Sequence, residues 1–200
     1  MTFSYGDDMA ERVRLAVDGG YYSQEKIIED LVELVEYDPD AEVYIAGLGV
    51  PLTEHMTRLV NGALARQNAA EASFPEVTDC DRLDSVFDQL AMSGILTGQD
   101  VGTTMSDVRD DMWEAVDQAR RCGEPARGWV AFHRQDVDRV VDTGTLCIAY
   151  AALTDLDDDF RIIGTEVAEA LRSAGFEVDW NGDPARRIEL HGLAWQKRRR

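Results

Sequence analysis

His133 is the residue of this chain best suited to proton transfer, because an unperturbed imidazole titrates near neutral pH. It follows the apolar run 129–132 and precedes Gln135, Asp136 and Asp138. A histidine beside a strand end, with a carboxylate one helical turn away, resembles a general base with its orienting partner. His133 and Asp136 are therefore the candidate catalytic residues, in a pocket that would hold a small molecule.

The sequence supplies little else for a reaction at His133. It contains no nucleophile elbow, no phosphate loop and no paired metal ligands. The other histidines, His55 and His191, lie at distant positions. A lone histidine at a strand end is more often structural than catalytic, so both interpretations of His133 stay open.

A second group of candidate residues could hold a hard cation. Asp155, Asp157 and Asp159 alternate along the chain, and Glu166 takes the twelfth place of a calcium-loop template that begins at Asp155. Against this, Phe160 stands where the template needs a glycine for a sharp turn. The same acids would also stabilise the N-terminus of the following helix, and both interpretations remain.

A glycine pattern after a possible strand resembles part of a dinucleotide-binding fingerprint. Gly47 and Gly49 precede a predicted helix, but the third glycine position holds Leu52, and Pro51 removes a backbone donor. We therefore expect no cofactor.

The charge is strongly acidic and unevenly distributed. The formal net charge is -19, although residues 186–200 contain six bases and only one acid. Such a surface repels nucleic-acid phosphates and favours a basic protein partner, so we expect neither a nucleic-acid nor a membrane partner. We expect the run Lys197–Arg200 to be a solvated tail.

The composition also indicates the cellular compartment of the protein. No apolar run approaches the roughly 18 residues of a spanning helix, and the N-terminus has acids where a signal peptide has bases. Three widely spaced cysteines suit a reducing compartment. We therefore expect a cytoplasmic protein.

The first part of the chain has the periodicity of helices. One is predicted to end at Gly19-Gly20, and a second begins after Ser23 as N-cap and stops before Pro39. The segment 43–50 is ambiguous, and a further helix begins with Thr53 as cap. The loop 68–77 contains Pro75 and loses periodicity, so we expect a helical unit over 1–75.

The second part, residues 76–200, alternates helices and strands. Asp79 is predicted to cap the first helix, and helices then span 106–119, 135–141 and the segment before Gly175. Strands are expected at 95–101, 129–133 and 146–151, with a hairpin from 176–180 to 188–190. The fold class is α+β: a helical unit followed by a mixed, largely antiparallel sheet covered by helices, which we expect on one face.

Four separated motifs carry a family resemblance. They are Thr78–Leu83 (TDCDRL), Gly128–Asp136 (GWVAFHRQD), Ala170–Phe176 (ALRSAGF) and Trp180–Pro184 (WNGDP). Together they resemble an uncharacterised bacterial domain family of actinobacterial type, known only as a domain of unknown function. The resemblance implies no activity.

Two functions are compatible with these features. The first is a non-catalytic interaction or regulatory protein whose acidic surface binds a basic partner. The alternative is a small-molecule-binding protein or enzyme that uses a pocket near His133 and Asp136. The acidic charge and the incomplete reaction site favour the first, and the oligomeric state is left open.

Overall fold

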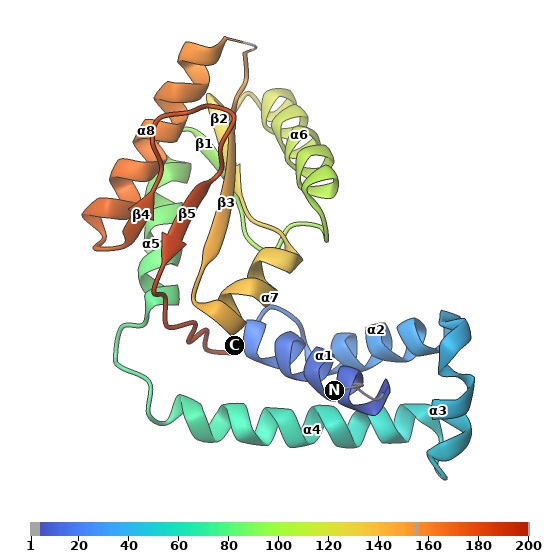
Figure 1. Cartoon of the computed structure of the whole chain (residues 1–200). Coiled ribbons are helices and arrows are strands. Elements are labelled where there is room, and N and C mark those ends of the chain that lie inside the picture. Colours follow the sequence, from blue (N-terminus) through green and yellow to red (C-terminus); the bar gives the residue numbers. More distant parts are fainter. Residues whose placement is uncertain (1–4, 155, 200) are drawn as a thin grey trace. The chain divides into compact units, whose positions relative to one another are not determined.

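The computed structural model describes residues 5–154 and 156–199 and divides the chain into two compact units. One unit comprises Met1–Glu76 together with Gln196–Arg200, and the other comprises Val77–Trp195. Figure 1 shows the first as helices only and the second as a sheet with helices around it. The predicted α+β fold class is confirmed.

The helical unit is built around one apolar cluster. Its elements are α1 (Tyr5–Gly19), α2 (Gln24–Tyr37), the 3-10 turn η1 (Pro39–Ala41), α3 (Glu42–Gly47) and α4 (Leu52–Glu71). Buried residues from α1, α2, η1 and α4 form the core, including Met9, Val17, Val35, Ala41 and Met56. The apolar spacing that predicted the helices therefore also defines what they bury.

Three local predictions in this unit differ in outcome. Ser23 caps α2 as predicted, because its hydroxyl accepts a hydrogen bond from the amide of Lys26 (3.2 Å). Thr53 does not cap α4 but lies within it, because the helix begins at Leu52, after Pro51, without a side-chain cap. The ambiguous segment 43–50 contributes to the short helix α3.

The basic C-terminal run is not the solvated tail that we expected. Arg199 donates through Nη1 to the carbonyl of Val17 (3.1 Å) and through Nη2 to the carbonyl of Tyr22. The Nζ of Lys197 lies 4.6 Å from the centre of the Tyr21 ring, within cation–π range. The expectation was wrong because the run finds carbonyls and aromatic rings left accessible by the helical unit.

The second unit contains a five-stranded mixed sheet. Its elements are α5 (Asp79–Met92), β1 (Ile95–Gly98), α6 (Met105–Cys122), β2 (Gly128–Ala131), α7 (Arg134–Thr143), β3 (Leu146–Ala152), α8 (Asp157–Ser173), β4 (Glu177–Asp179) and β5 (Ile188–His191). The strand order is β1-β2-β3-β5-β4. Among the described strands, β1 and β2 pair in parallel and the other neighbours are antiparallel; the predicted hairpin is the antiparallel β4–β5 pair.

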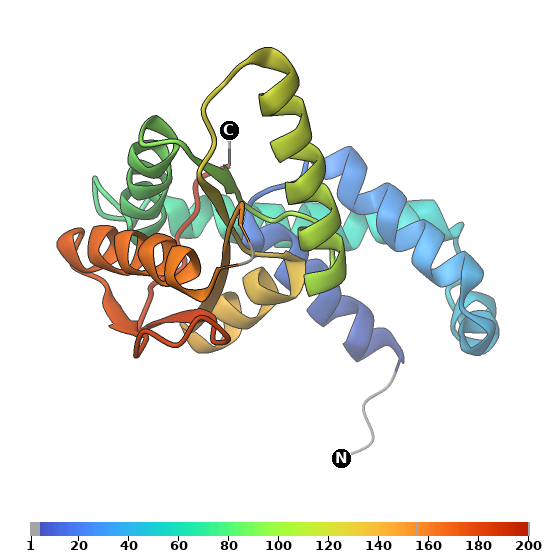
Figure 2. The same ribbon diagram turned by 90° about the horizontal axis from the view of Figure 1, so that it is seen from above.

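Helices cover both faces of this sheet, not one as expected. Figures 1 and 2 show α5 and α8 on one side and α6 on the other. Every residue of the central strand β3 is buried, which requires cover on both faces. On the α6 side, Val108, Met112 and Val116 pack against Trp129 and Ala149.

The same arrangement, a capping box, begins several helices of this unit. Thr78, not Asp79, caps α5, and its side chain and that of Asp81 satisfy each other's backbone amides as a capping box. Asp79 instead accepts hydrogen bonds from Arg82 (2.6 Å) and the amide of Ala194 (2.9 Å). The expected cap was wrong because two adjacent residues both suit the position and a distant contact occupies one of them.

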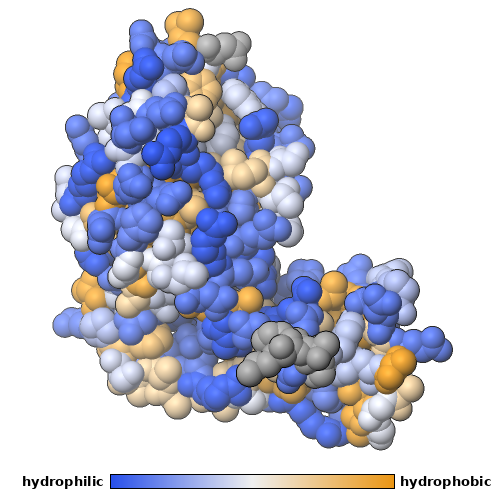
Figure 3. Space-filling model, in the orientation of Figure 1, coloured by the Kyte–Doolittle hydropathy of each residue, from blue (hydrophilic) through white to orange (hydrophobic). Residues whose placement is uncertain are grey.

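The exposed side chains are mainly hydrophilic. The face drawn in Figure 3 is largely blue, with apolar residues scattered over it. Among the described helices, none combines the length and the apolar character needed to cross a membrane.

Candidate functional site

His133 and Asp136 form the capping box of α7. Nδ1 of His133 accepts a hydrogen bond from the amide of Asp136 (3.1 Å), and Oδ2 of Asp136 accepts one from the amide of His133 (3.3 Å). The sequence places a histidine where Ser, Thr or Asp usually stands, with an acid three residues later. The structure thus brings the two candidate catalytic residues into direct contact.

Both side chains are buried and have further partners. His133 is 5% exposed and Asp136 is 1% exposed. Nη1 of Arg187, the residue before β5, donates to both carboxylate oxygens of Asp136 at 3.0 and 2.9 Å. The arginine therefore provides the buried carboxylate with an ionic partner, which an isolated charge in the interior would lack.

The electrostatics of this cluster favour a neutral imidazole. Burial is the largest effect and lowers the pKa of His133. The positive charges of Arg187 and Arg139 lower this pKa further, whereas the Asp136 carboxylate raises it. Nδ1 lies 3.1 Å from the amide nitrogen of Asp136 and 3.1 Å from its Oδ2, so the imidazole meets both a donor and a carboxylate at this atom. The imidazole thus serves as the N-cap of α7 and is held there by its contact with Asp136.

The acidic segment is distributed along α8. Asp155 lies outside the described residues, whereas Asp157 and Asp159 belong to the first turn of the helix. Asp159 accepts a hydrogen bond from the hydroxyl of Thr154. Their position is the one in which carboxylates stabilise a helix N-terminus.

Glu166 is engaged elsewhere on the same helix. Its two carboxylate oxygens accept hydrogen bonds from Nη1 (2.9 Å) and Nη2 (2.6 Å) of Arg127. It follows Asp159 by seven residues, a rise of about 10 Å along an α-helix. The structure therefore does not bring Glu166 together with Asp157 and Asp159.

The terminal hairpin contains a group of possible ligands that sequence reasoning missed. Asp179 of β4 and Glu189 and His191 of β5 have ligand atoms within 4.8 Å of one another. The signal was the alternation of polar residues on both strands, which places them on one face once the register is known. Asp179 also lies 4.0 Å from Nη2 of Arg186, which competes for its charge.

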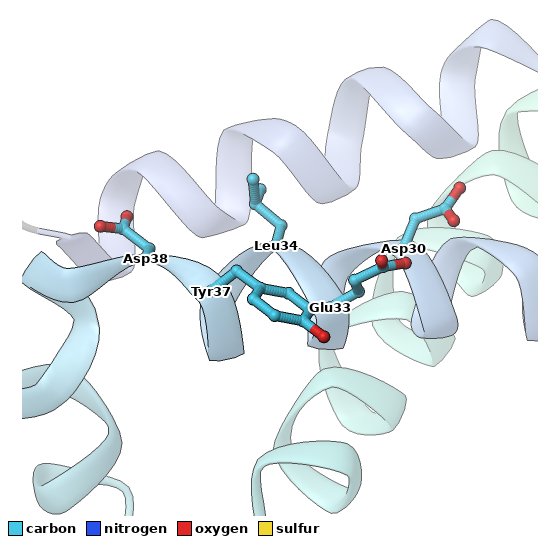
Figure 4. A pocket seen from close by; sticks show the side chains of 5 residues that line it. All are labelled: Asp30, Glu33, Leu34, Tyr37 and Asp38. Carbon is cyan, nitrogen blue, oxygen red and sulfur yellow. The ribbon is translucent and has the colours of Figure 1, made fainter.

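The helical unit carries an acidic surface pocket of about 440 Å³. Asp30, Glu33, Leu34, Tyr37 and Asp38 line it, and Figure 4 shows the Tyr37 ring beside Glu33 along α2. Leu34 is 41% exposed and Tyr37 is 81% exposed. We call these five residues the α2 pocket; it joins carboxylates to an exposed apolar and aromatic surface.

The fold and these sites define an α+β protein with a separate helical unit and no recognised catalytic constellation among the described residues. The chain belongs to the family described as "Domain of unknown function (DUF6891)", whose model matches residues 4–199. The resemblance to a family of unknown function is thereby confirmed. No curated protein and no solved structure matches the chain.

Proposed function

We propose that this protein is a non-catalytic interaction protein that binds a basic protein partner through the α2 pocket. The observation that carries the proposal is the exposed ring of Tyr37 next to the side chain of Glu33 on α2. Residues 25–42 contain eight acids and a single base, Lys26. The charge around the pocket is therefore complementary to a lysine- or arginine-rich segment.

Besides general electrostatic attraction, the α2 pocket can make a specific contact with an arginine side chain of the partner. A guanidinium group can stack on a tyrosine ring while donating hydrogen bonds to a carboxylate. Among the described residues, Tyr37 and Glu33 have no hydrogen bond or ion pair that would compete with this contact. Exposed Leu34 adds apolar surface next to them.

The enzyme alternative has less support from the contacts of its candidate residues. His133 and Asp136 are buried, and the imidazole Nδ1 accepts a backbone hydrogen bond. These contacts support a role in positioning α7. We also place the protein in the reducing cytoplasm, which is supported by the absence of a disulfide at Cys80, Cys122 and Cys147 in the described chain.

The test uses the full chain and a capped peptide of alternating arginine and leucine. We expect binding, read by calorimetry and by NMR amide shifts centred on Glu33 and Tyr37, that weakens as salt is raised. Glu33→Lys should reduce the affinity by about tenfold or more, because it replaces attraction with repulsion.

The matched control is Asp88→Lys, which makes the same charge change at an exposed acidic position of α5. We expect it to reduce the affinity by less than about threefold, through net charge alone. If Asp88→Lys weakens peptide binding as much as Glu33→Lys does, the attraction is general and the α2 pocket is not the binding site.

A further inference from the structure

A cavity of about 340 Å³ lies on the α6 side of the sheet in the Val77–Trp195 unit. Residues of α6, β2, β3, the first turn of α8 and the segment 184–187 line it. The alanines at 149 and 151 of β3 leave space beside the large ring of Trp129. This volume is at the lower end of the range typical of ligand pockets.

Two arginines of the cavity have unused hydrogen-bond donors. Arg109 of α6 makes no hydrogen bond or ion pair with the described residues. Arg187 uses only Nη1, which binds Asp136 and contacts the sulfur of Met105, so Nε and Nη2 remain available in the described chain. In a chain of net charge -19, this concentration of cationic donors marks a place for an anion.

Trp129 supplies an independent observation. Its side chain lines the cavity and is 3% exposed, and its indole Nε1 is buried without a hydrogen-bond partner among the described residues. Buried donors in folded proteins are normally paired. The indole N–H of Trp129 is therefore a donor that no acceptor of the described chain satisfies.

Aromatic side chains form part of the cavity wall. Trp113, which is 37% exposed, and Phe160 line the cavity together with Trp129. Aromatic side chains favour stacked or edge-to-face contacts with another ring. The lining thus combines ring-binding surface with donors for an oxyanion.

We propose that this cavity binds a small planar molecule that carries an oxyanion, an aryl carboxylate or aryl phosphate. Arg109 and the unused donors of Arg187 bind the oxyanion, and the ring packs against Trp113, Trp129 and Phe160. The volume admits a compact ligand of one or two rings rather than a dinucleotide. This site is independent of the α2 pocket and of the proposed protein partner.

The test observes the indole N–H signals of the nitrogen-15 labelled full chain by NMR. The chain has four tryptophans, and the variant Trp129→Phe assigns the signal of interest. We expect benzoate or phenyl phosphate to shift the Trp129 signal in a saturable manner. Benzyl alcohol, which lacks the oxyanion, and inorganic phosphate, which lacks the ring, should each shift it at least about tenfold more weakly.

A charge variant tests the arginine contact. Arg109→Gln should reduce the affinity for the bound anion by about tenfold, because one charge-assisted contact is lost. Arg121→Gln is the matched control, since it removes the same charge from an exposed position on the same helix outside the cavity. Arg187 is left unchanged because it also neutralises Asp136.

Several outcomes would overturn the proposal. The first is an unmoved Trp129 signal with both benzoate and phenyl phosphate up to about 10 mM, a concentration that would reveal even very weak binding. Equal shifts with benzyl alcohol would show that the ligand needs no oxyanion. Equal shifts with inorganic phosphate would show that the ligand needs no aromatic ring. Equal effects of Arg109→Gln and Arg121→Gln would show that the anion responds only to net charge.

Discussion

Arg187 and Asp136 form an ion pair in which one guanidinium nitrogen donates to both oxygens of a buried carboxylate, at 3.0 and 2.9 Å. The same carboxylate accepts the backbone amide of His133 at the start of α7. One arginine therefore links the residue that precedes strand β5 to the N-terminus of a helix, and the same residue lines the neighbouring cavity. Arg187 thus has a structural role at Asp136 and, in our proposal, a second role in binding an anion.

Breaking this pair should be costly. Arg187→Met leaves the Asp136 carboxylate buried without its cation, and we expect a loss of about 3 kcal/mol in the free energy of unfolding, measured with urea. The control Arg161→Met removes the exposed ion pair with Asp158 and should cause no measurable change. A loss near zero for Arg187→Met would mean that the carboxylate is solvated or protonated.

The pH dependence of stability should report His133. Because burial lowers the pKa of His133 below its usual 6.5, the unfolded chain binds the proton more tightly than the folded chain. Stability should therefore fall as the pH drops below about 6.5. Facing groups modify the size of the effect: the Asp136 carboxylate opposes it, while Arg187 and Arg139 reinforce it.

The variant His133→Asn isolates this contribution, since asparagine can cap a helix but does not titrate. Urea unfolding from pH 5 to 8 should give a flatter stability curve for the variant than for the natural chain. His191→Asn, at a half-buried position of β5, is the control. Parallel curves for the natural chain and His133→Asn would contradict the expected pKa shift.

Two helical glycines should respond to alanine with opposite signs. A Cβ on Gly164 would lie 2.6 Å from Trp180 and 2.8 Å from Tyr150, two rings joined by a hydrogen bond of 3.1 Å. Gly164→Ala should cost about 1–3 kcal/mol by overpacking. Gly62→Ala meets only Arg66, at 3.9 Å, and should gain about 0.5–1 kcal/mol from helix propensity. Thermal unfolding followed by circular dichroism compares them, and the same sign for both would refute the packing argument.

The C-terminal run should stabilise the helical unit. Arg199→Ala removes the hydrogen bonds to the carbonyls of Val17 and Tyr22, and we expect a loss of about 2 kcal/mol. Arg121→Ala makes the same charge change at an exposed position and should leave the melting temperature unchanged. Similar melting temperatures for both variants would restore the interpretation of a solvated tail.

Local signals predicted most elements of the second unit. The hairpin that became β4 and β5 was visible because alternating residues flank Asn181 and Gly182, and both features act over a few positions. The cap of α5 was misplaced by one residue because Thr78 and Asp79 both suit it. Only the distant contact of Asp79 with the amide of Ala194 distinguishes them.

Only part of the candidate site could be predicted from the sequence. His133 and Asp136 were found because a capping box spans three residues and leaves a sequence pattern. Their partner Arg187 is 51 residues beyond Asp136 and was missed, because the pairing of β5 with β3 leaves no local pattern in the sequence. The tryptophan and arginines of the cavity were missed for the same reason.

The sequence by itself determined the α+β class, the acidic charge and most helix and strand positions, because periodicity, caps and turns depend on neighbouring residues. Tertiary structure decided what those elements bury and which charges meet. It placed helices on both faces of β3, paired Arg187 with Asp136 and brought Arg199 to Tyr22, 177 positions away. Such contacts depend on strand order and packing, which no local pattern encodes.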